Sequence, residues 1–251
     1  MSKELTNEEL NSLIDRSTEQ YTKFLRELSS NAEDKTSRKK AGLISYWIFD
    51  YIRMLRKEKS FDGTSMLKYR RGDVLMVNFG YRIGCEFGGR HFAVVIDNNN
   101  NIKSGTISVL PLTSKKEGYK DSYFTHELQH GLYELHNKKL EALLDDCRAD
   151  LRQIEKDRST FDTTPTDEQF EVFQRRISVV GEKIKEANAL QLALEKLKSG
   201  TVVQLGQITT ISKIRILNPK KAADSLNKIR LHPDDMDVIN EKFKSLYLFT
   251  K

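Results

Sequence analysis

The chain has 251 residues, of which 38% are hydrophobic and 31% charged, a composition typical of a soluble globular protein with a heavily charged surface. No window approaches the roughly 20 apolar residues that span a bilayer, and the N-terminus, with Glu4, Glu8 and Glu9, lacks the basic start and apolar centre of a signal peptide, so we expect a cytoplasmic protein without a membrane partner. The net charge of +6 is compatible with an anionic partner such as nucleic acid, although charge alone does not identify one.

Two amphipathic helices are predicted in the first part of the chain. Residues 6–30 place apolar side chains at helical spacing, and Thr6 with Glu9 can form a capping box at the start. The polar segment "SSNAEDKTSRKK" separates this helix from a second broad apolar stripe over residues 43–55. We expect the two helices to pack as a hairpin and to form a helical extension over residues 1–66.

From Asp73 onward the apolar pattern changes to that of β-strands. Short runs rich in Val, Ile, Leu and Phe are separated by glycine and asparagine clusters, and strand character returns later in "GTVVQLGQITTISKIRIL". The first three runs cover residues 73–79, 91–97 and 106–112. We expect an antiparallel sheet, followed by a last helix, "HPDDMDVINEKFKSLYLF", that begins near Pro233.

Helical periodicity covers the stretch between these two groups of strands. Its second half follows an a/d heptad pattern, and its first half carries a comparable apolar stripe. The segment "FDTTPTDEQ" lies between the halves, where Thr164 can cap a helix and Pro165 suits its first turn. The simplest interpretation is an antiparallel coiled-coil hairpin inserted into a sheet domain, which gives an α+β fold. The predicted parts are an N-terminal extension (1–66), a sheet domain (67–128 and 198–251) and an inserted hairpin (129–197).

An unusual pair of polar residues, Arg90 and His91, lies between a glycine-rich loop and the apolar run "FAVVI". If "IDNNNNIKSGTI" connects two antiparallel strands, pairing Asp97 with Thr106 fixes the register, since paired positions then sum to a constant. This register places His91 opposite about Leu112, and the next residues on the second strand carry hydroxyl groups. The side chains expected to converge at this end of the hairpin, beside the loop "YRIGCEFGG", are Arg90, His91, Thr113 and Ser114.

One imidazole, one guanidinium and two hydroxyl groups suit a phosphate site. Arginine supplies a fixed fork of donors, histidine can carry a proton near neutral pH, and hydroxyl groups can hold non-bridging oxygens. No cluster with metal-ligand spacing accompanies these residues. Cys85 and Cys147 lie far apart without CxxC spacing, so neither a zinc knuckle nor a disulfide framework is predicted. We expect no metal and no cofactor.

At these residues the sequence resembles the MazF/PemK family of endoribonuclease toxins from type II toxin–antitoxin systems. The resemblance runs through "RRGDVLMVNFG", "IGCEFGG", "HFAVVIDN" and "VLPLTSKK", then resumes at "LKSGTVVQLGQITTISKIRIL" and the last helix. It covers residues 69–128 and 198–249, and it leaves out the N-terminal helices and the long hairpin. The resemblance implies a small antiparallel barrel of the SH3-like or CcdB-like kind, a homodimer, an antitoxin partner, and cleavage of single-stranded RNA without metal.

The family's usual loop reads Gly-Ser-Glu-Gln-Gly-Gly-x-Arg-Pro. A match without gaps places Glu86 on the Glu of that loop, Arg90 on its variable position and His91 on its catalytic Arg. Either His91 has taken over the catalytic role, or a local slip leaves that role to Arg90; the first is favoured, because only then does "AVVIDN" align without a gap. Thr113 matches the family's catalytic Thr, and Thr209 stands where many relatives carry Arg.

The resemblance also implies a reaction. The RNA 2′-hydroxyl would attack the adjacent phosphorus, with His91 as acid or base, Arg90 and Thr113 stabilising the developing charge, and Glu86 as a second proton-transfer group. DNA, which lacks the 2′-hydroxyl, should resist cleavage. The residues expected to contact the substrate are Arg82, Ser114, Lys115, Gln207 and Thr209.

Other interpretations of the same residues stay open. A histidine at a strand end is often a structural group, "LTSKK" is ordinary strand-end chemistry, and Glu86 and Lys115 can be solvated surface residues. At the level of the whole protein, a CcdB-like toxin would bind and inhibit a protein target such as DNA gyrase. A third alternative is an RNA-binding module without cleavage activity.

Overall fold

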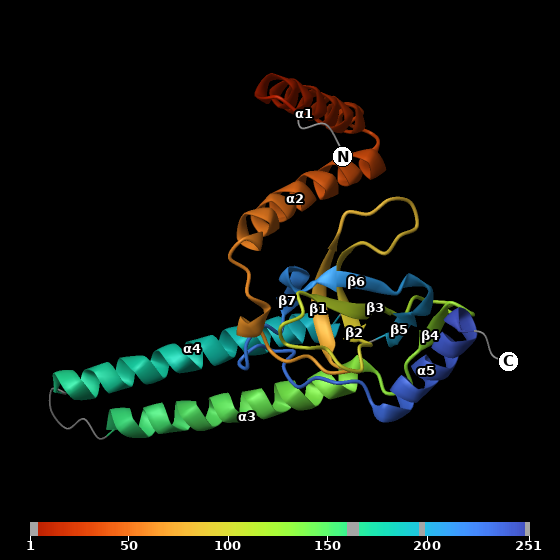
Figure 1. Ribbon diagram of the computed structural model, residues 1–251. Helices are drawn as coiled ribbons and strands as arrows, with labels where there is room; N and C mark the ends of the chain where they lie inside the picture. The colour runs from red at the N-terminus through yellow and green to blue at the C-terminus, as the bar shows by residue number, and fades with distance from the viewer. Residues whose placement is uncertain (1–4, 160–165, 196–198, 249–251) are drawn as a thin grey trace. The chain divides into compact units, whose positions relative to one another are not determined.

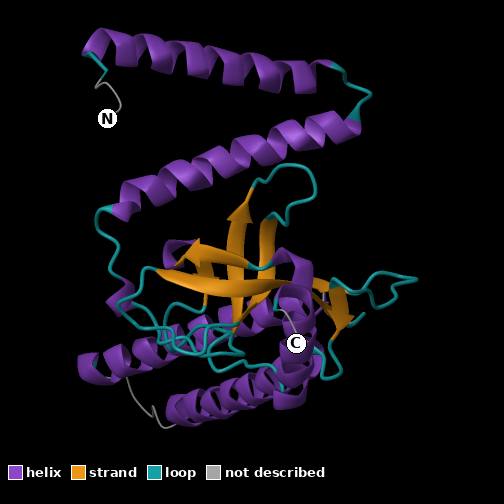
Figure 2. Cartoon of the chain, turned by 45° about the vertical axis from the view of Figure 1, so that its right-hand side comes forward, coloured by secondary structure: helices purple, strands orange, loops and turns teal. Residues whose placement is uncertain are grey.

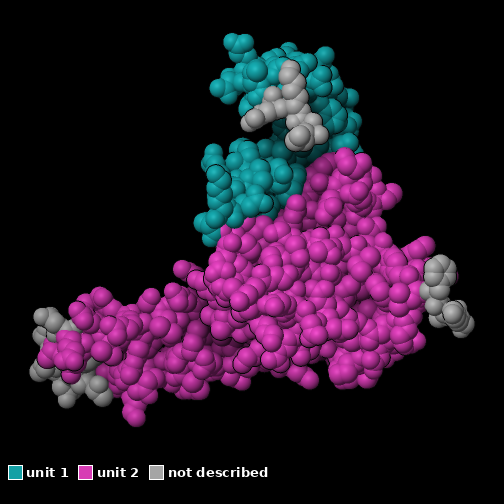
Figure 3. All heavy atoms as spheres, viewed as in Figure 1, with its two compact units in different colours: residues 1–60 teal, residues 61–251 magenta. Residues whose placement is uncertain are grey.

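The computed structural model of the protein describes residues 5–159, 166–195 and 199–248. The chain forms two units, residues 1–60 and 61–251 (Figure 3). Helices and one antiparallel sheet make up the structure, which is therefore of the predicted α+β class (Figure 2). Within the described part of the chain, none of the helices combines the length and apolar character needed to cross a bilayer.

The first unit is a pair of helices, α1 (Asn7–Ser30) and α2 (Lys35–Glu58). The predicted capping box is present, because the Thr6 hydroxyl accepts the Glu9 amide at 3.2 Å while the Glu9 carboxylate accepts the Thr6 amide at 2.8 Å. The described side chains of α1 include no buried residue, and α2 buries only Ala41 and Ile44. The pair therefore covers little of its own apolar surface.

The second unit begins earlier than the predicted boundary after residue 66. Met66 is buried in the core beneath the sheet, and Phe61 packs against that core. These residues follow the end of the first unit at Ser60. We accordingly propose that the sheet domain starts at Phe61.

A seven-stranded antiparallel sheet organises the second unit (Figure 1). Its strands are β1 (Val74–Gly80), β2 (Gly89–Val95), β3 (Thr106–Ser114), β4 (Thr125–Glu127), β5 (Thr201–Gln204), β6 (Thr209–Ser212) and β7 (Ile216–Asn218). The strand order is β4-β5-β3-β2-β1-β7, and β6 also pairs with β3. The short 3₁₀ turn η3 (Lys213–Arg215) joins β6 to β7, so it connects the two ends of the path β6-β3-β2-β1-β7.

The register between β2 and β3 differs from the predicted one by one residue. Phe92 pairs with Leu112 and Val95 with Val109, so that paired positions sum to 204 rather than 203. The physical cause lies in the connecting loop, because the Asp97 carboxylate itself accepts the Ser108 amide at 3.0 Å in place of a backbone carbonyl. A shift of one residue matters, since it changes which side chains share a face of the sheet.

Two hydrophobic cores lie on the two faces of the sheet. The helix-side core joins one face to the start of α3 (Leu132–Ser159) and to α5 (Pro233–Tyr247). Its main members are Val74, Phe92, Val94, Leu110, Leu112, Leu132, Val203, Met236 and Ile239. The loop-side core occupies the other face and includes Leu75, Val77, Phe79, Ala93, Val95, Val109, Ile211 and Ile216, with Phe61 and Phe87 packed against it.

A long helical arm is formed by α3 and α4 (Asp167–Glu195), which lie side by side in both ribbon views (Figures 1 and 2). Lys183 of α4 contacts Asp146 and Asp150 of α3 at 2.5 Å each, which fixes the antiparallel alignment of the two helices. The predicted cap at Thr164 and Pro165 lies outside the described residues. Thr166, just before α4, exchanges hydrogen bonds with Gln169 and serves as a capping residue.

Strand character was predicted over residues 200–217, and the structure forms short strands there rather than one continuous strand. These are β5, β6 and β7, separated by two 3₁₀ turns, of which the first (Leu205–Gln207) contains Gly206. A Cβ atom on Gly206 would lie 3.0 Å from the Phe124 ring, so a larger residue would crowd this turn. The predicted strand character is confirmed in three short strands.

Candidate active site

His91 lies near the start of β2, at the end of the loop-side core. It pairs with Val77 of β1 and shares the face of Ala93, because side chains along a strand alternate. Its ring meets the Phe87 ring edge-on, with centroids 4.6 Å apart. Burial lowers the pKa of the His91 imidazole below its ordinary value, so the neutral form, which can accept a proton, is favoured at neutral pH.

Thr113 lies on the same face as His91. The β2–β3 ladder ends at the pair Phe92–Leu112. Extending its register by one residue sets His91 opposite Thr113, on the same face of the two strands. The Thr113 hydroxyl donates to the Ser114 carbonyl at 2.9 Å, leaving its oxygen lone pairs available as acceptors. The one-residue correction in register is what places these two side chains on one face.

Arg90 and Ser114 lie on the other face of the same two strands. Arg90 pairs with Asn78 and lies on the same face of β2 as Phe92, a residue of the helix-side core. Ser114 likewise shares the face of Leu112 on β3. Both Arg90 and Ser114 are exposed. The four predicted side chains are therefore close in the sheet but divided between its faces, with His91 and Thr113 on one and Arg90 and Ser114 on the other.

The loop of residues 81–88 lies next to His91 and carries Arg82 and Glu86. The Arg82 guanidinium donates to the Phe79 carbonyl at 3.1 Å and lies 3.9 Å from the Glu86 carboxylate, and Glu86 is mostly exposed. The loop closes tightly, because a Cβ atom on Gly88 would lie only 2.8 Å from the Gly80 carbonyl oxygen. A glycine is therefore required where the loop returns to β2.

Gln207 holds this loop through both ends of its side-chain amide. Its oxygen accepts the Phe87 amide at 3.1 Å, and its nitrogen donates to the Cys85 carbonyl at 3.2 Å. Gln207 thus fixes the segment that carries Glu86 and presents Phe87 to His91. The substrate contact expected of Gln207 from the sequence stays a prediction.

Arg215 is a second residue that supports the site and that the sequence did not single out. Its guanidinium donates to the carbonyls of Asn78 at 3.3 Å and Phe79 at 3.2 Å. These carbonyls lie where the β1–β2 register shifts, between Asn78 and Gly80. Nothing in "SKIRIL" distinguishes Arg215 from a surface arginine, because its acceptors lie more than 130 residues earlier in the chain.

Lys115 and Glu127 form an ion pair beyond the end of β3, with 2.8 Å between Nζ and Oε2. Thr113 pairs with Val202, and Val202 pairs with Glu127, so Glu127 shares the face of Thr113 at a distance of two strand spacings, roughly 10 Å. Glu127 was missed in the sequence because β4 has only three residues. Both side chains are partly exposed and border the His91 face.

Thr209 lies farther along the same face. Thr209 pairs with Val109 of β3. Val109 precedes Thr113 by four residues, a separation of roughly 13 Å along the strand. The half-buried Thr209 hydroxyl is not adjacent to His91. Of the predicted substrate contacts, Ser114 and Lys115 follow Thr113 directly in the chain, whereas Thr209 lies farther along the sheet.

The two cysteines are free thiols, Cys85 exposed and Cys147 buried. The metal-capable side chains that the described residues bring together are His130, His232 and Asp234, which lie away from His91. The site around His91 thus offers a neutral imidazole, a hydroxyl group, a carboxylate and several cations. This set can move protons and hold a phosphate diester.

Comparison with known protein families matches the part of the chain that contains His91. Residues 70–177 match the family of PemK-like, MazF-like toxins of type II toxin–antitoxin systems. This stretch is MazF/PemK-like, as the sequence motifs indicated, and it includes His91, Thr113 and Glu86. The match extends through α3 into α4, whereas the predicted later segment, residues 198–249, lies outside it. No curated protein matches the chain.

Proposed function

We propose that the protein is a toxin endoribonuclease that cleaves single-stranded RNA by attack of the substrate's own 2′-hydroxyl. The observation that carries this proposal is the placement of His91 and Thr113 on one face, at the end of an apolar core, within the part of the chain that matches the toxin family. In the strand path β6-β3-β2-β1-β7, the turn η3 joins the first strand, β6, to the last, β7. This connection supports a small SH3-like or CcdB-like barrel as the scaffold.

His91 is proposed as the general base. In its neutral form it takes the proton from the 2′-hydroxyl while the 2′-oxygen forms a bond to phosphorus and the bond from phosphorus to the 5′-oxygen breaks. Burial favours this neutral form by lowering the His91 pKa. The departing 5′-oxygen takes a proton from a water molecule, which the Glu86 carboxylate can orient, and a 2′,3′-cyclic phosphate is the first product.

The other candidate residues bind the charged backbone in this proposal. The Thr113 hydroxyl would turn its O–H from the Ser114 carbonyl to a non-bridging oxygen, and Arg82 approaches from the loop. Arg90 and Ser114, on the opposite face, hold neighbouring phosphates where the strand passes round the edge of the sheet. Lys115 already pairs with Glu127, so RNA must compete with that carboxylate for it. Thr209 would contact a more distant nucleotide.

Two partners follow from the family. A type II toxin is neutralised by a protein antitoxin, which we propose as the physiological partner. Homodimer formation is proposed on the same ground. In this proposal neither the antitoxin nor a second copy of the chain supplies a group to the reaction, because His91 and Thr113 belong to the same chain.

The main rival is a CcdB-like toxin that binds a protein target without cleaving RNA. A binding toxin has no need of a half-buried neutral histidine beside a hydroxyl group, and this pair favours the enzyme. A non-catalytic RNA-binding module is disfavoured by the same observation.

The test is incubation of the full chain with a long single-stranded RNA and with DNA of the same sequence, each with and without EDTA. We expect the RNA alone to be cut, equally well in EDTA, with 2′,3′-cyclic phosphate or 3′-phosphate ends. Equal cutting of DNA, or loss of cutting in EDTA, would contradict the proposed chemistry. Absence of RNA cleavage combined with toxicity would favour the binding toxin.

A further inference from the structure

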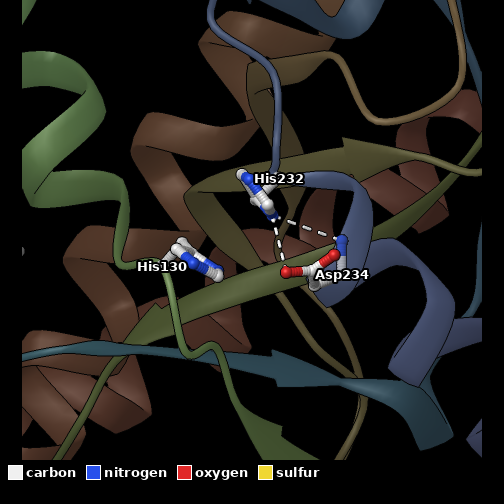
Figure 4. A group of neighbouring side chains, drawn as sticks. All are labelled: His130, His232 and Asp234. Carbon is white, nitrogen blue, oxygen red and sulfur yellow. Dashed lines mark hydrogen bonds and ion pairs between the residues drawn. The ribbon is translucent and has the colours of Figure 1, made fainter.

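Three side chains suited to metal binding meet where the helical arm leaves the sheet. His130 lies just before α3, and His232 and Asp234 lie at the start of α5 (Figure 4). One ligand atom from each of them lies within 4.8 Å of the other two. About 100 residues separate the first histidine from the other two groups, so no spacing motif announces the cluster in the sequence.

Asp235 positions His130. The buried Asp235 carboxylate accepts the amides of Gln129 at 2.8 Å and His130 at 3.2 Å, which fixes the backbone immediately before α3 against α5. Its Oδ2 atom also lies 3.4 Å from His130 Nδ1. A carboxylate behind one ring nitrogen, with the other nitrogen free to coordinate, is the usual arrangement of a metal-binding histidine.

The Nδ1 atom of His130 is a polar atom without a hydrogen-bond partner among the described residues. The atom is buried, and its contact with Asp235 does not have hydrogen-bond geometry. A small rotation of the ring would convert this contact into a hydrogen bond. That rotation would also fix the tautomer with Nε2 free as a ligand.

The helix start positions the other two groups. His232 is the N-cap of α5, and its Nδ1 atom accepts the Asp234 amide at 3.3 Å, while Pro233 occupies the first turn. The Asp234 carboxylate lies 3.3 Å from the same nitrogen, so imidazole and carboxylate already face each other. The two histidine rings stack with centroids 4.0 Å apart, which brings residues from two distant segments into direct contact.

The cluster is open to solvent. The side chains of His130 and His232 are 40% and 44% exposed, and that of Asp234 is 66% exposed, so an ion can enter without opening a core. Ligands around tetrahedral zinc lie about 3.4 Å from one another, given metal–ligand distances of about 2.0–2.1 Å. Closing the present separation of up to 4.8 Å requires only rotation of exposed side chains.

We propose that His130, His232 and Asp234 bind one Zn²⁺ ion that joins the base of the helical arm to α5. Two imidazole nitrogens and one carboxylate oxygen form a ligand set typical of zinc, with water in the fourth position. The neighbouring residues Leu132 and Met236 belong to the helix-side core, whereas His91 lies on the loop-side face. The metal is therefore a structural link and takes no part in RNA cleavage.

The first test uses the full chain after removal of metals with EDTA and dialysis. Zn²⁺ is titrated calorimetrically, thermal unfolding is followed with and without Zn²⁺, and Co²⁺ is added as a spectroscopic substitute. We expect one ion per chain, a higher midpoint of unfolding with Zn²⁺, and visible absorption bands of tetrahedral Co²⁺. Absence of binding by the folded wild-type chain would overturn the proposal.

Variants then locate the ion. His232→Asn removes the imidazole but keeps an N-cap residue, His130→Gln removes the second imidazole, and Asp234→Asn removes the charge of the carboxylate. Asp237→Asn, an exposed acid one turn further along α5, is the matched control. We expect each ligand variant to bind Zn²⁺ at least about tenfold more weakly, and the control to bind like wild type. Wild-type affinity in all three ligand variants would place the ion elsewhere and contradict the proposal.

The outcomes are independent of RNA cleavage. Under both proposals EDTA lowers thermal stability but leaves the cleavage rate unchanged. Loss of the metal site with intact RNA cleavage would remove only the zinc proposal, and the reverse result would remove only the enzyme proposal.

Discussion

At the scale of single residues, the site depends on the alternation of side chains along a strand. Arg90 and His91 are adjacent in sequence but face opposite sides of the sheet, and only His91 shares a face with Thr113. The resemblance seen in the sequence implies that one of these two residues takes the place of the family's catalytic arginine. The structure favours His91, because a base must act on the same side as the hydroxyl that holds the phosphate.

The pH dependence of cleavage distinguishes the two residues. Because burial lowers the His91 pKa, we expect a rate that is constant near pH 7 and falls as the pH drops through a value below about 6.5. His91→Gln should remove this inflection and slow cleavage by about 100-fold or more. The measurement is the rate of cleavage of a short RNA between pH 4.5 and 8.

Arg90→Lys is the matched comparison. It should lower the rate but keep the inflection, because it alters the geometry of phosphate binding and leaves proton transfer intact. Near-normal activity of His91→Gln together with an inactive Arg90→Lys would transfer the catalytic role to Arg90.

His136 supplies a prediction about stability. It is fully buried, its Nδ1 contacts the Leu132 carbonyl at 2.8 Å, and burial, together with the charge of Lys139, lowers its pKa. The folded state thus binds fewer protons than the unfolded state, so its stabilising contribution is complete above about pH 6.5 and is lost as the pH falls through the lowered pKa. Thermal unfolding should therefore occur at lower temperature at pH 5 than at pH 7.

Replacing His136 by Leu tests the origin of this effect. The variant should show a smaller difference in unfolding temperature between the two pH values, with His91 accounting for part of what remains. An unchanged difference would mean that other groups control the acid sensitivity.

Several residues of the site could be predicted from the sequence, and others could not. His91 and Thr113 could be proposed from the sequence because they end apolar strands that a short hairpin brings together. Gln207 was identified as a contact residue, but its role in holding the loop depends on backbone atoms of Cys85 and Phe87 that no pattern reveals. Glu127 was missed for a similar reason, since its position follows from a strand that is too short to show periodicity.

At the scale of secondary structure elements, the helical arm is joined to the sheet more deeply than its periodicity indicates. Leu132 and His136 in the first turns of α3 are fully buried, and Lys139 donates to the carbonyls of Asp224 at 3.3 Å and Asn227 at 3.0 Å. Among the described residues, the outer part of the arm instead has contacts between its own two helices, such as that of Arg176 with Asp157. The base and the outer part should therefore respond differently to removal.

Shortening the arm tests this division. Replacing residues 148–179 by four Gly/Ser residues, which can span roughly 13 Å, should leave the domain folded, since packed helices lie about 8–10 Å apart. Replacing all of residues 129–198 should unfold it, because Leu132 and His136 would leave the core. Circular dichroism and thermal unfolding of the two variants are the measurements. A folded domain in the second variant would show that the whole insertion is separable, as the sequence suggested.

The elements differ in how well they could be predicted. The helices have long apolar stripes, and α5 begins at Pro233 as expected. The later strands have three or four residues each and are interrupted by 3₁₀ turns, so that their short runs merge into one apparent strand. At the first of these turns Gly206 packs closely against Phe124, a contact that the sequence does not reveal.

At the scale of the whole molecule, two units share one chain, and the proposed active site lies entirely in the second. The first unit leaves much apolar surface of α1 and α2 uncovered, including Leu13, Phe24 and Phe49. Such a surface is typical of a segment that contacts a partner. The enzyme proposal therefore assigns no catalytic part to residues 1–60.

Expression of residues 61–251 alone tests this assignment. Because the second unit contains both proposed reacting groups, it should inhibit growth at least as strongly as the full chain, and the His91→Gln version should not. The measurement is growth after induction, with the amount of folded protein checked in parallel. If the shortened protein is folded but harmless, residues 1–60 assist the toxic activity instead.

The central claim is that His91 activates the substrate's own 2′-hydroxyl, and a single substitution in the RNA tests it most directly. Once a cut site in a short RNA has been mapped, the same oligonucleotide is prepared with one 2′-deoxyribose immediately 5′ to the scissile phosphate. We predict that cleavage at that bond disappears while other cut sites remain, because the nucleophile is missing only there. Cleavage of the modified bond at the normal rate would contradict the account, since an external nucleophile would then be doing the chemistry.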